Sequence, residues 1–403
     1  MPIMKNYILL LKEERVLAQL SFIQLIAYFG AWFSNVAIYT LLLKMDVPAY
    51  VVALTAALHF LPGVLQAPFS GPLIDRYSPK KLMLLLTSIE ILATLMLISV
   101  HDISQLWLLF ILIFLRMGAS SFYFTIEMSL LPRILPPHKL QLANEIHSII
   151  WSFSYTFGMA ISGFIVYAVG VYMAFALDAS LFVIGMLLLL RIDFNVTPSG
   201  NKNSMMTMMK ESFAYIQEKP LVLHLILLHA FVGFTAFDAL VVLMVDNFYA
   251  TILATSLALG LMHSFRAIGL VIGPMVLGRY MNNQRLLYLF ILQALSVILW
   301  SFTMHNFYTS LLVSIFVGFS TTTMWSYTYT LLQHHTDAAY YGRVVAYNDM
   351  FFLFVGASVS LMTGILYEVG LSLPMIAIVF SLGFLLAAIY YIWIKSHYEL
   401  KEF

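Results

Sequence analysis

Five charged side chains and two histidines interrupt long apolar stretches of this sequence, and they are the groups best placed to do chemistry. A carboxyl group can bind and release a proton or a cation, and a guanidinium can hold an anion or an acid. A charged side chain inside a bilayer costs roughly 2.5–3.5 kcal/mol on insertion scales, so each should face the protein interior and find a partner there. The seven residues are Glu90, Arg116, Asp178, Asp238, Arg266, His59 and His263.

The stretches around these residues predict an all-α membrane protein with twelve spanning helices. Hydrophobic residues make up 62% of the 403 residues and charged residues 10%, which a water-soluble domain does not show. The mean hydropathy is +0.92, and a span needs about 20 apolar residues. Apolar runs and polar breaks place the spans at 16–43, 49–69, 82–100, 106–130, 145–169, 171–190, 221–245, 253–274, 286–303, 307–331, 344–367 and 372–394.

Composition excludes several classes of function. A net charge of +1 leaves no basic surplus to neutralise nucleic-acid phosphates. The absence of cysteine removes disulfides, thiolate metal sites and cysteine nucleophiles. We find no Walker loop, no G-x-S-x-G elbow and no H-E-x-x-H, so we expect neither an enzyme nor a cofactor. No histidine pair at helical spacing carries a nearby carboxylate in a cavity span, so no metal site is predicted.

The distribution of basic residues predicts the orientation in the membrane. About 17 of the 20 Lys and Arg residues fall in the even-numbered gaps between spans and in the two tails. Basic residues are retained on the cytoplasmic side, so both termini are expected there. The short loops favour a bacterial inner membrane, and a single twelve-span chain already contains a complete cavity, so we expect a monomer.

The chain also contains an internal repeat. At a shift of 200 residues Gly118 and Ser120 meet Gly318 and Ser320, and at a shift of 203 Asn35 meets Asp238. Two nearly constant shifts indicate two parallel six-helix bundles. We therefore divide the chain into an N-terminal bundle (1–193), a cytoplasmic linker with an amphipathic helix (194–220) and a C-terminal bundle (221–403).

One loop carries a family resemblance. The segment Gly71-Pro-Leu-Ile-Asp75-Arg76-Tyr-Ser-Pro-Lys80-Lys81, between spans two and three, resembles the loop motif of the major facilitator superfamily. Shorter segments, among them Gly30-Ala-Trp-Phe-Ser-Asn-Val-Ala37, resemble its bacterial branch of siderophore, drug and metal exporters, which includes the enterobactin exporter. The resemblance covers the whole chain and implies a transporter with a site at the membrane midplane.

The resemblance also implies a gate. In relatives the loop aspartate lies beside the start of span eleven, and a basic loop residue pairs with an acid at the cytoplasmic end of span four. Here these positions correspond to Asp75 beside Arg343 and to Glu127. We expect a latch on the cytoplasmic side; a solvated charge cluster is the alternative. The expected gating residues are Gly71, Asp75, Arg76, Lys80, Glu127 and Arg343.

Asp238 is the first candidate for proton coupling. The family fold places span seven at the cavity, and the repeat sets Asp238 opposite the neutral Asn35. Apolar surroundings disfavour the charged form of a carboxyl group, which is what a proton carrier needs. A structural ion pair with Arg266 is the alternative. Arg116 occupies a span-four position where many proton-exchanging relatives carry an arginine, and a structural role is its alternative.

Polar and aromatic side chains along spans one, four and ten suit an amphipathic substrate. They offer stacking and cation–π surfaces with a few hydrogen-bonding groups; ordinary interhelical bonding is the alternative reading. The expected cavity residues are Gln24, Tyr28, Trp32, Asn35, His59, Ser121, Tyr123, His263, Thr322, Trp325 and Tyr329.

These features together predict a secondary active transporter. Our preferred hypothesis is a proton-coupled antiporter that exports small drug-like or siderophore-like molecules by alternating access, with sodium as the alternative coupling ion. The alternatives are a proton-coupled or facilitative importer, a divalent metal exporter, and a receptor or lipid-handling protein that keeps the fold without transport.

Overall fold

The computed structural model of the chain is built of helices, and it describes residues 2–194, 196, 205–337 and 340–401. Within these residues, twelve helical segments are long and apolar enough to cross a membrane, which confirms the predicted fold. Helices suit this setting because they satisfy their backbone hydrogen bonds internally. The segments are Arg15–Lys44, Ala49–Ser70, Pro79–Ser99, Ile103–Ile134, His138–Val169, Val171–Leu190, Pro220–Tyr249, Thr255–Leu277, Leu286–Thr303, Phe307–His335, Tyr341–Glu368 and Leu373–His397.

Contacts divide the chain into two compact units. The first comprises Met1–Met45 and Phe69–Lys202, and the second comprises Asp46–Pro68 and Asn203–Phe403. Span two therefore packs mainly with the second unit, and the division falls within its second helical piece. The predicted boundaries at 193 and 221 rest on the sequence repeat and stay a prediction.

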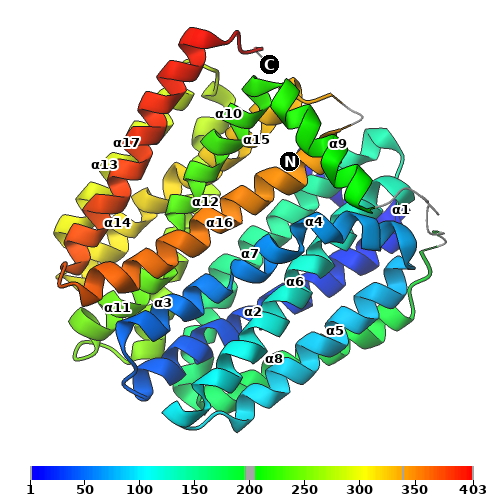
Figure 1. The fold of residues 1–403 in the computed structure, drawn as a ribbon. Coiled ribbons are helices and arrows are strands. Elements are labelled where there is room, and N and C mark those ends of the chain that lie inside the picture. The colour runs from blue at the N-terminus through cyan, green and yellow to red at the C-terminus, as the bar shows by residue number, and fades with distance from the viewer. Residues whose placement is uncertain (1, 195, 197–204, 338–339, 402–403) are drawn as a thin grey trace. The chain divides into compact units, whose positions relative to one another are not determined.

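The first unit is a bundle in which α2 is the central helix (Figure 1). Helix α2 packs against α7 and α8, while α5 packs against α6 and α8. Two clusters of buried apolar side chains support this arrangement, one around Leu20 and Ile126 and one around Leu17 and Leu131. The helices are α1 (Pro2–Glu13), α2 (Arg15–Lys44), α5 (Pro79–Met96), α6 (Leu106–Ile134), α7 (Pro137–Val169) and α8 (Val171–Leu190).

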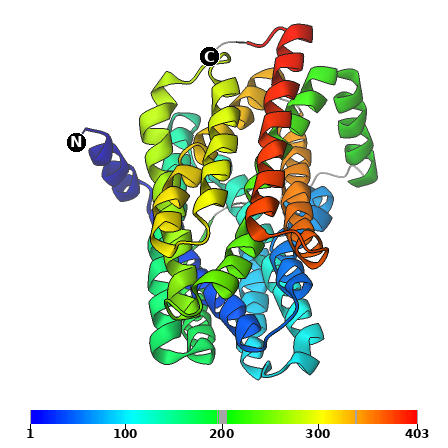
Figure 2. The same cartoon turned by 90° about the vertical axis from the view of Figure 1, so that its left-hand side faces the viewer.

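Helix α1 was not predicted from the sequence. In Figure 2 it is set off from the other helices of its unit. It packs against α7 and α2, and the Tyr7 hydroxyl donates to Glu145 at 2.8 Å. This hydrogen bond raises the pKa of Tyr7. At the α1–α2 junction, Lys139 pairs with Glu13 at 2.9 Å and with Glu14 at 2.7 Å.

The second unit contains the remaining helices. Helix α3 packs against α16, α12 against α14, and α13 against α17. Helix α9 lies within the range 194–220, which is expected from the sequence to be a linker; that role stays a prediction. The helices are α3 (Ala49–Leu58), α4 (Leu61–Arg76, divided between the units), α9 (Met205–Glu218), α10 (Pro220–Ala230), α11 (Asp238–Met244), α12 (Thr255–Leu277), α13 (Leu286–Thr303), α14 (Phe307–Phe319), α15 (Thr321–His335), α16 (Tyr341–Glu368) and α17 (Leu373–His397).

Two spans of the second unit are interrupted. Span seven passes from α10 through a 3₁₀ turn, Phe231–Thr235, to α11. Span ten breaks at Ser320, between α14 and α15. There the side-chain oxygen of Gln293 on α13 accepts hydrogen bonds from Ser320 at 2.6 Å and Thr321 at 3.1 Å. Broken helices are tolerated in membranes when neighbouring groups satisfy the freed polar atoms.

Glycines bring α12 and α14 into close contact. A Cβ at Gly269 or Gly273 would overlap the backbone carbonyls of Ile315 and Phe319, and one at Gly318 would overlap the carbonyl of Arg266. Small residues at this four-residue spacing allow two helix backbones to approach closely in a membrane. The contact fixes the rotation of α12, which carries His263 and Arg266.

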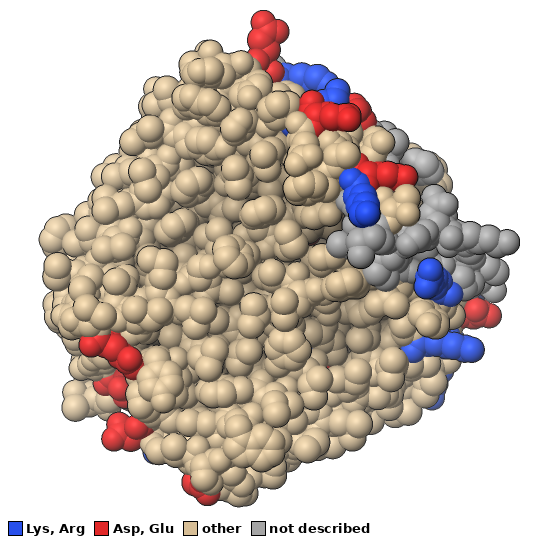
Figure 3. Space-filling model, viewed as in Figure 1, with Lys and Arg blue, Asp and Glu red and all other residues tan. Residues whose placement is uncertain are grey.

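The outer flanks of the helices are apolar. On the face drawn in Figure 3, charged side chains are few and uncharged side chains cover most of the surface. Large apolar residues such as Trp107, Phe302 and Ile389 are exposed along the flanks. This distribution suits helices that face lipid.

Candidate functional site

A buried ion pair joins α6 to α8 in the first unit. Arg116 Nη2 lies 2.8 Å from Asp178 Oδ2, and the two side chains are 5% and 0% exposed. Arg116 also donates to Thr94 Oγ1 at 3.1 Å and to the carbonyl of Ala31 at 3.3 Å. The Ser34 hydroxyl donates to the same oxygen of Asp178. Helices α2 and α5 thus supply the extra hydrogen bonds that a buried ion pair between α6 and α8 requires.

Helix α2 comes close to this pair at Gly30. A Cβ at that position would lie 2.9 Å from Asp178 Oδ1 and 3.0 Å from Leu181 Cδ1. A larger residue would therefore displace the carboxylate or separate the helices. The ion pair gives Arg116 a structural role, and its role in proton coupling stays a prediction.

A small cavity lies between α2, α5, α6 and α8, beside the ion pair. Its volume is about 30 Å³, which is about the volume of one water molecule. Six polar side chains line it: Gln24, Tyr28, Thr87, Glu90, Ser120 and Tyr123. Glu90 is only 4% exposed. The structure therefore places Gln24, Tyr28 and Tyr123 of the expected substrate cavity around a buried carboxyl group.

The other two residues of the predicted polar face of span one, Trp32 and Asn35, do not line this cavity. Trp32 packs against Tyr155 of α7, with ring centroids 4.7 Å apart, and its carbonyl accepts a hydrogen bond from Ser162 at 2.7 Å. Asn35 is buried and 8% exposed. Neither lines the small cavity, because these residues lie two to three helical turns beyond Gln24, roughly 12–17 Å along the helix axis.

His147 of α7 was not predicted. Its ring nitrogen contacts the Gln24 amide, and its ring meets Tyr28 edge to face at 6.2 Å. The sequence places His147 near the start of the expected span at 145–169. Its polar position in an apolar run was the signal that could have identified it.

In the second unit, Asp238 begins α11 directly after the interruption of span seven. Its side chain is 27% exposed, and Oδ1 lies 3.6 Å from Nδ1 of His263, whose side chain is 2% exposed. The helix break brings free backbone groups and a titratable side chain to one place, as broken helices do at transporter binding sites. The structure thus brings together two of the predicted residues.

Arg266 lies one turn beyond His263 on α12. It donates to the carbonyl of Thr235 at 2.7 Å, and its guanidinium lies 5.4 Å from the centroid of the Phe237 ring. Across the described part of the chain, no ion pair joins Arg266 to Asp238. Arg266 instead holds the interrupted backbone immediately before Asp238.

Aromatic rings cluster around a buried histidine in the second unit. The His229 ring lies 5.6 Å from the rings of Trp325, Tyr329 and Phe352, and Nδ1 is 2.8 Å from Thr328 Oγ1. Trp325 and Tyr329 stack at 4.9 Å. The predicted residues Trp325 and Tyr329 therefore form one surface. The fully buried His229, which the sequence did not single out, supports it.

Other expected cavity residues form hydrogen bonds within their own helices or lie beside a helix break. His59 Nδ1 is 2.9 Å from the carbonyl of Thr55, one turn earlier. The carbonyl of Ser121 accepts from Thr125 at 3.0 Å. Thr322 is half-buried, two residues after the break of span ten.

The expected gating residues are only partly visible. The side chain of Asp75 and the details of Gly71 lie outside the described residues, and Arg76 is exposed at the end of α4. Lys80 donates to the carbonyl of Leu190 at 3.0 Å, where the end of α8 attracts a cation. Glu127 is 3% exposed. Among the described side chains, none of the basic loop residues pairs with it, so the latch stays a prediction.

Arg343 is engaged by the linker helix. Its Nη1 lies 3.2 Å from Glu211 Oε2 on α9, and its guanidinium lies 5.2 Å from the Tyr340 ring. Tyr340 stacks on Tyr215 of α9 at 4.2 Å. Burial raises the pKa of Tyr215, whose hydroxyl accepts the Asp337 amide proton at 2.9 Å. Helix α9 is thereby fastened to the start of span eleven.

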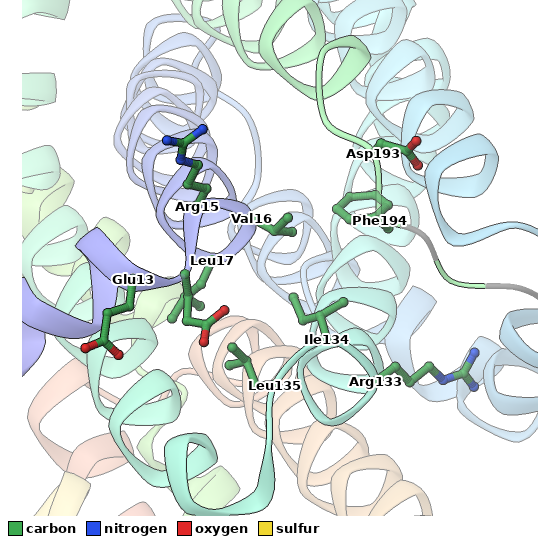
Figure 4. Close-up of a pocket in the computed structure, with 10 residues that line it drawn as sticks. Glu13, Arg15, Val16, Leu17, Arg133, Ile134, Leu135, Asp193 and Phe194 are labelled. Carbon is green, nitrogen blue, oxygen red and sulfur yellow. The ribbon is translucent and has the colours of Figure 1, made fainter.

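A larger, open pocket of about 460 Å³ lies where α1 meets α2 and α6 ends. Figure 4 shows that the charged ends of Glu13, Arg15, Arg133 and Asp193 are spread around its rim and do not converge. Such dispersed charges do not define a ligand, since binding sites combine an apolar surface with a few convergent polar groups. Among the described residues, no three His, Cys, Asp or Glu side chains come together to hold a metal ion.

Residues 20–360 match the Major Facilitator Superfamily. The chain belongs to this family. With twelve apolar helices among its described residues, it is a multi-pass membrane protein of this transporter family. The finer resemblance to the siderophore, drug and metal exporters is not addressed by this match.

Two curated relatives come from Bacillus subtilis (strain 168). The uncharacterized MFS-type transporter YfiS is 27% identical over 221 residues, which is 53% of this chain and 52% of YfiS. The uncharacterized MFS-type transporter YkuC is 27% identical over 179 residues, 44% of this chain and 41% of YkuC. The chain thus spans about half the length of the curated relatives it matches.

Solved transporter structures share the fold. The nucleoside transporter NupG has a TM-score of 0.70 at 14% identity, covering 95% of this chain and 100% of its own. The POT family transporter PepTSo has a TM-score of 0.70 at 11% identity, covering 95% and 98%. A bacterial homologue of the human lysosomal transporter Spinster has 0.69 at 13%, covering 95% and 96%. At these identities the likeness is one of fold alone.

Proposed function

We propose that this protein is a proton-coupled antiporter that exports small amphipathic organic molecules, of the drug or siderophore class, with Asp238 as the proton carrier. The observation that carries the proposal is the position of Asp238 at the broken span seven. Its carboxylate is partly open, with His263 beside it at 3.6 Å and with Arg266 turned toward the Thr235 carbonyl. A carboxylate without a committed cation is free to exchange a proton or bind a cationic substrate.

The proposed coupling is a competition for one carboxylate. An ionised Asp238 attracts a cationic or hydrogen-bonding substrate from the cytoplasm, and protonation from outside removes the negative charge and releases the substrate. Loss of the proton to the cytoplasm restores the carboxylate. Alternating access converts this exchange into export, and Arg266 keeps the interrupted backbone in place during the cycle.

The substrate class follows from the aromatic surface. Trp325 and Tyr329 stack at 4.9 Å, and Trp325 is 38% exposed. Exposed aromatic faces bind flat apolar groups and organic cations. We favour such molecules over metal ions, which need convergent carboxylate or imidazole ligands.

The proposal includes a place and an orientation. We place the protein in a bacterial inner membrane, which the Bacillus relatives support, with both termini in the cytoplasm. We propose a monomer.

Proteoliposomes with an imposed pH gradient test this function. A panel of lipophilic cations, siderophores and divalent metals is added to the full-length protein, and proton movement is recorded with a pH-sensitive dye. We expect at least one lipophilic cation or siderophore to cause proton release in wild type and none to do so in Asp238→Asn. Asp238→Asn should still exchange labelled substrate across the membrane without a gradient, because the aromatic surface is intact.

Asp246→Asn is the matched control, since it removes a second carboxylate from the same span. Asp246 lies in the π-helical turn that follows α11, and its side chain is exposed. Full gradient-driven transport in Asp238→Asn would exclude Asp238 as the carrier. Proton and substrate movement in the same direction would show an importer, and a response to metals alone would show a metal exporter. Binding of a compound without any transport would show a receptor.

A further inference from the structure

The small cavity of the first unit contains a carboxyl group that the proposed transport cycle does not use. Glu90 lines this cavity from α5, and its side chain is buried, with 4% exposed. The groups around it indicate what it can do.

The charges around Glu90 do not balance. The nearby cation is Arg116, and its Nη2 is already 2.8 Å from Asp178 Oδ2. Its other hydrogen bonds go to Thr94 and to the Ala31 carbonyl. One buried cation therefore serves two buried carboxyl groups, so the group stays neutral overall only when one carboxyl carries a proton.

Asp178 is the carboxyl that keeps its charge. It accepts hydrogen bonds from both Ser34 and Arg116, and hydrogen bonds of this kind favour the ionised form. The other polar groups that line the cavity are uncharged when their protons are in place. They are Gln24 and Tyr28 of α2, Thr87 of α5, and Ser120 and Tyr123 of α6.

The cavity gives Glu90 a means of proton exchange. Its volume of about 30 Å³ accommodates a water molecule, and its walls supply more than the two to four polar partners that a buried water needs. A hydronium ion in the cavity can give its proton to a Glu90 oxygen and leave water, and the reverse transfer restores the carboxylate. Ala31 and Phe182 line the same cavity and also contact Arg116.

We propose that Glu90 is a second proton-binding site, which exchanges its proton through this cavity beside the Arg116–Asp178 pair. The inference deepens the proposed function, because it adds a proton site in the first unit to that of Asp238 in the second. The site is testable without any transport, so its failure is separate from failure of the antiport proposal. If both hold, one cycle can move more than one proton.

Glu127 is the other buried glutamate of the first unit, and the geometry separates the two. Glu127 is 3% exposed, and its Oε2 has no hydrogen-bond partner among the described residues. It does not line the cavity. Glu127 therefore lacks the route for exchange that Glu90 has, which makes it the matched comparison.

Infrared difference spectroscopy of the full-length protein in lipid vesicles tests the proposal. Protonated carboxyl groups have a distinct carbonyl band, and glutamate labelled with carbon-13 on its side chain shifts only the glutamate share of that band. In wild type we expect a label-sensitive band in acidic buffer that disappears in alkaline buffer. Glu90→Gln should lose this titrating band, whereas Glu127→Gln and the surface variant Glu368→Gln should keep it.

Glu90→Asp guards against misfolding of the glutamine variant, because it should keep a titrating band that no longer responds to the glutamate label. The proposal is overturned if labelled wild type shows no glutamate band, or one of constant height across the pH range. It is also overturned if Glu127→Gln, and not Glu90→Gln, removes the band. Loss of the band on adding sodium chloride at constant pH, but not choline chloride, would assign the site to sodium instead of a proton.

Discussion

Asp178 and Asp238 have the same side chain, but their surroundings suit them to different roles. The charge of Asp178 is matched by Arg116 at 2.8 Å, and no part of its side chain is exposed. Asp238 is 27% exposed, and the titratable group beside it is His263, at 3.6 Å. A buried carboxylate held in an ion pair is closed to solvent and substrate, while one that is partly open and loosely paired is accessible to both. The difference makes Asp178 a structural group and Asp238 the candidate for coupling.

We expect removal of one member of the Arg116–Asp178 pair to be more harmful than removal of both. Asp178→Leu leaves a buried arginine without its carboxylate, which should cost about 3–5 kcal/mol of unfolding free energy. The double variant Arg116→Met/Asp178→Leu should recover most of that loss. Reversible unfolding in mixed micelles measures both. Equal losses in the single and double variants would contradict a stabilising pair.

At this scale the sequence revealed the charged residues but not their partners. Arg116, Asp178, Asp238 and Arg266 stood out because charges are rare in apolar spans. Which of them meet depends on the rotation of each helix about its axis, and spacing in the chain does not determine this. His147 and His229 were missed for the same reason, since their neighbours come from other helices.

Among the helices, the contact between α12 and α14 does the most to position the site. Its glycines remove side chains where the two backbones meet, so the direction in which His263 and Arg266 point is set by backbone contact. Rotation of α12 would move both residues away from Asp238 together.

We therefore expect Gly269→Ala to destabilise the protein and weaken coupling. The added methyl group would overlap the carbonyl of Ile315, and overpacking of this kind costs about 1–3 kcal/mol. Thermal unfolding measures the loss. Gly278→Ala is the control, because a Cβ there meets nothing within 4 Å. Equal melting temperatures for both variants would show that the helices separate without cost.

Helix α9 is held to the start of span eleven by a stack, a hydrogen bond and an ion pair. Tyr215→Ala removes the stack on Tyr340 and the bond to the Asp337 amide. Together these should stabilise α9 by about 1–2 kcal/mol. We expect amide hydrogen exchange in 205–218 to become roughly tenfold faster.

Phe213→Ala is the matched control for that experiment, since Phe213 lies on the same helix with 55% of its surface exposed. Exchange in Phe213→Ala should stay close to wild type. Equal acceleration in both variants would mean that loss of any aromatic residue loosens α9, and that its docking does not depend on Tyr215.

Helix positions were largely predictable, because a span requires a fixed length of apolar residues and its ends carry turn-forming or basic residues. The interruptions within spans seven and ten were not predictable from the sequence. Span seven reads as one apolar run, and only Gly233 and Thr235 hint at the 3₁₀ turn. Span ten breaks where Gln293, distant in sequence, satisfies the freed groups. Helix α1 was not predicted, because it is too short to span a membrane.

At the scale of the whole chain, the direction of insertion is the property that most affects the proposed export. The chain contains no cysteine, so a single introduced thiol reports its own location. Ile103 and Tyr77 are suitable positions because they lie at successive turns between spans and are 52% and 55% exposed.

We expect Ile103→Cys to react with a membrane-impermeant maleimide in intact cells, and Tyr77→Cys to react only after the membrane is opened. Positive charge around Tyr77 should retain that turn in the cytoplasm. Labelling in the opposite order would show that the chain has the inverted orientation in the membrane. The proposed exporter would then be an importer.

The ion pair between Arg116 and Asp178 has a further consequence during synthesis. Arg116 lies on the fourth span and Asp178 on the sixth, so the arginine emerges from the ribosome about 60 residues before its carboxylate, which takes several seconds at cellular rates. Until then its charge is unmatched in an environment that disfavours it. We therefore expect the fourth span to stay beside the insertion machinery until the sixth span has been synthesised. Nascent chains that end after span five should leave the membrane more readily than chains that include span six.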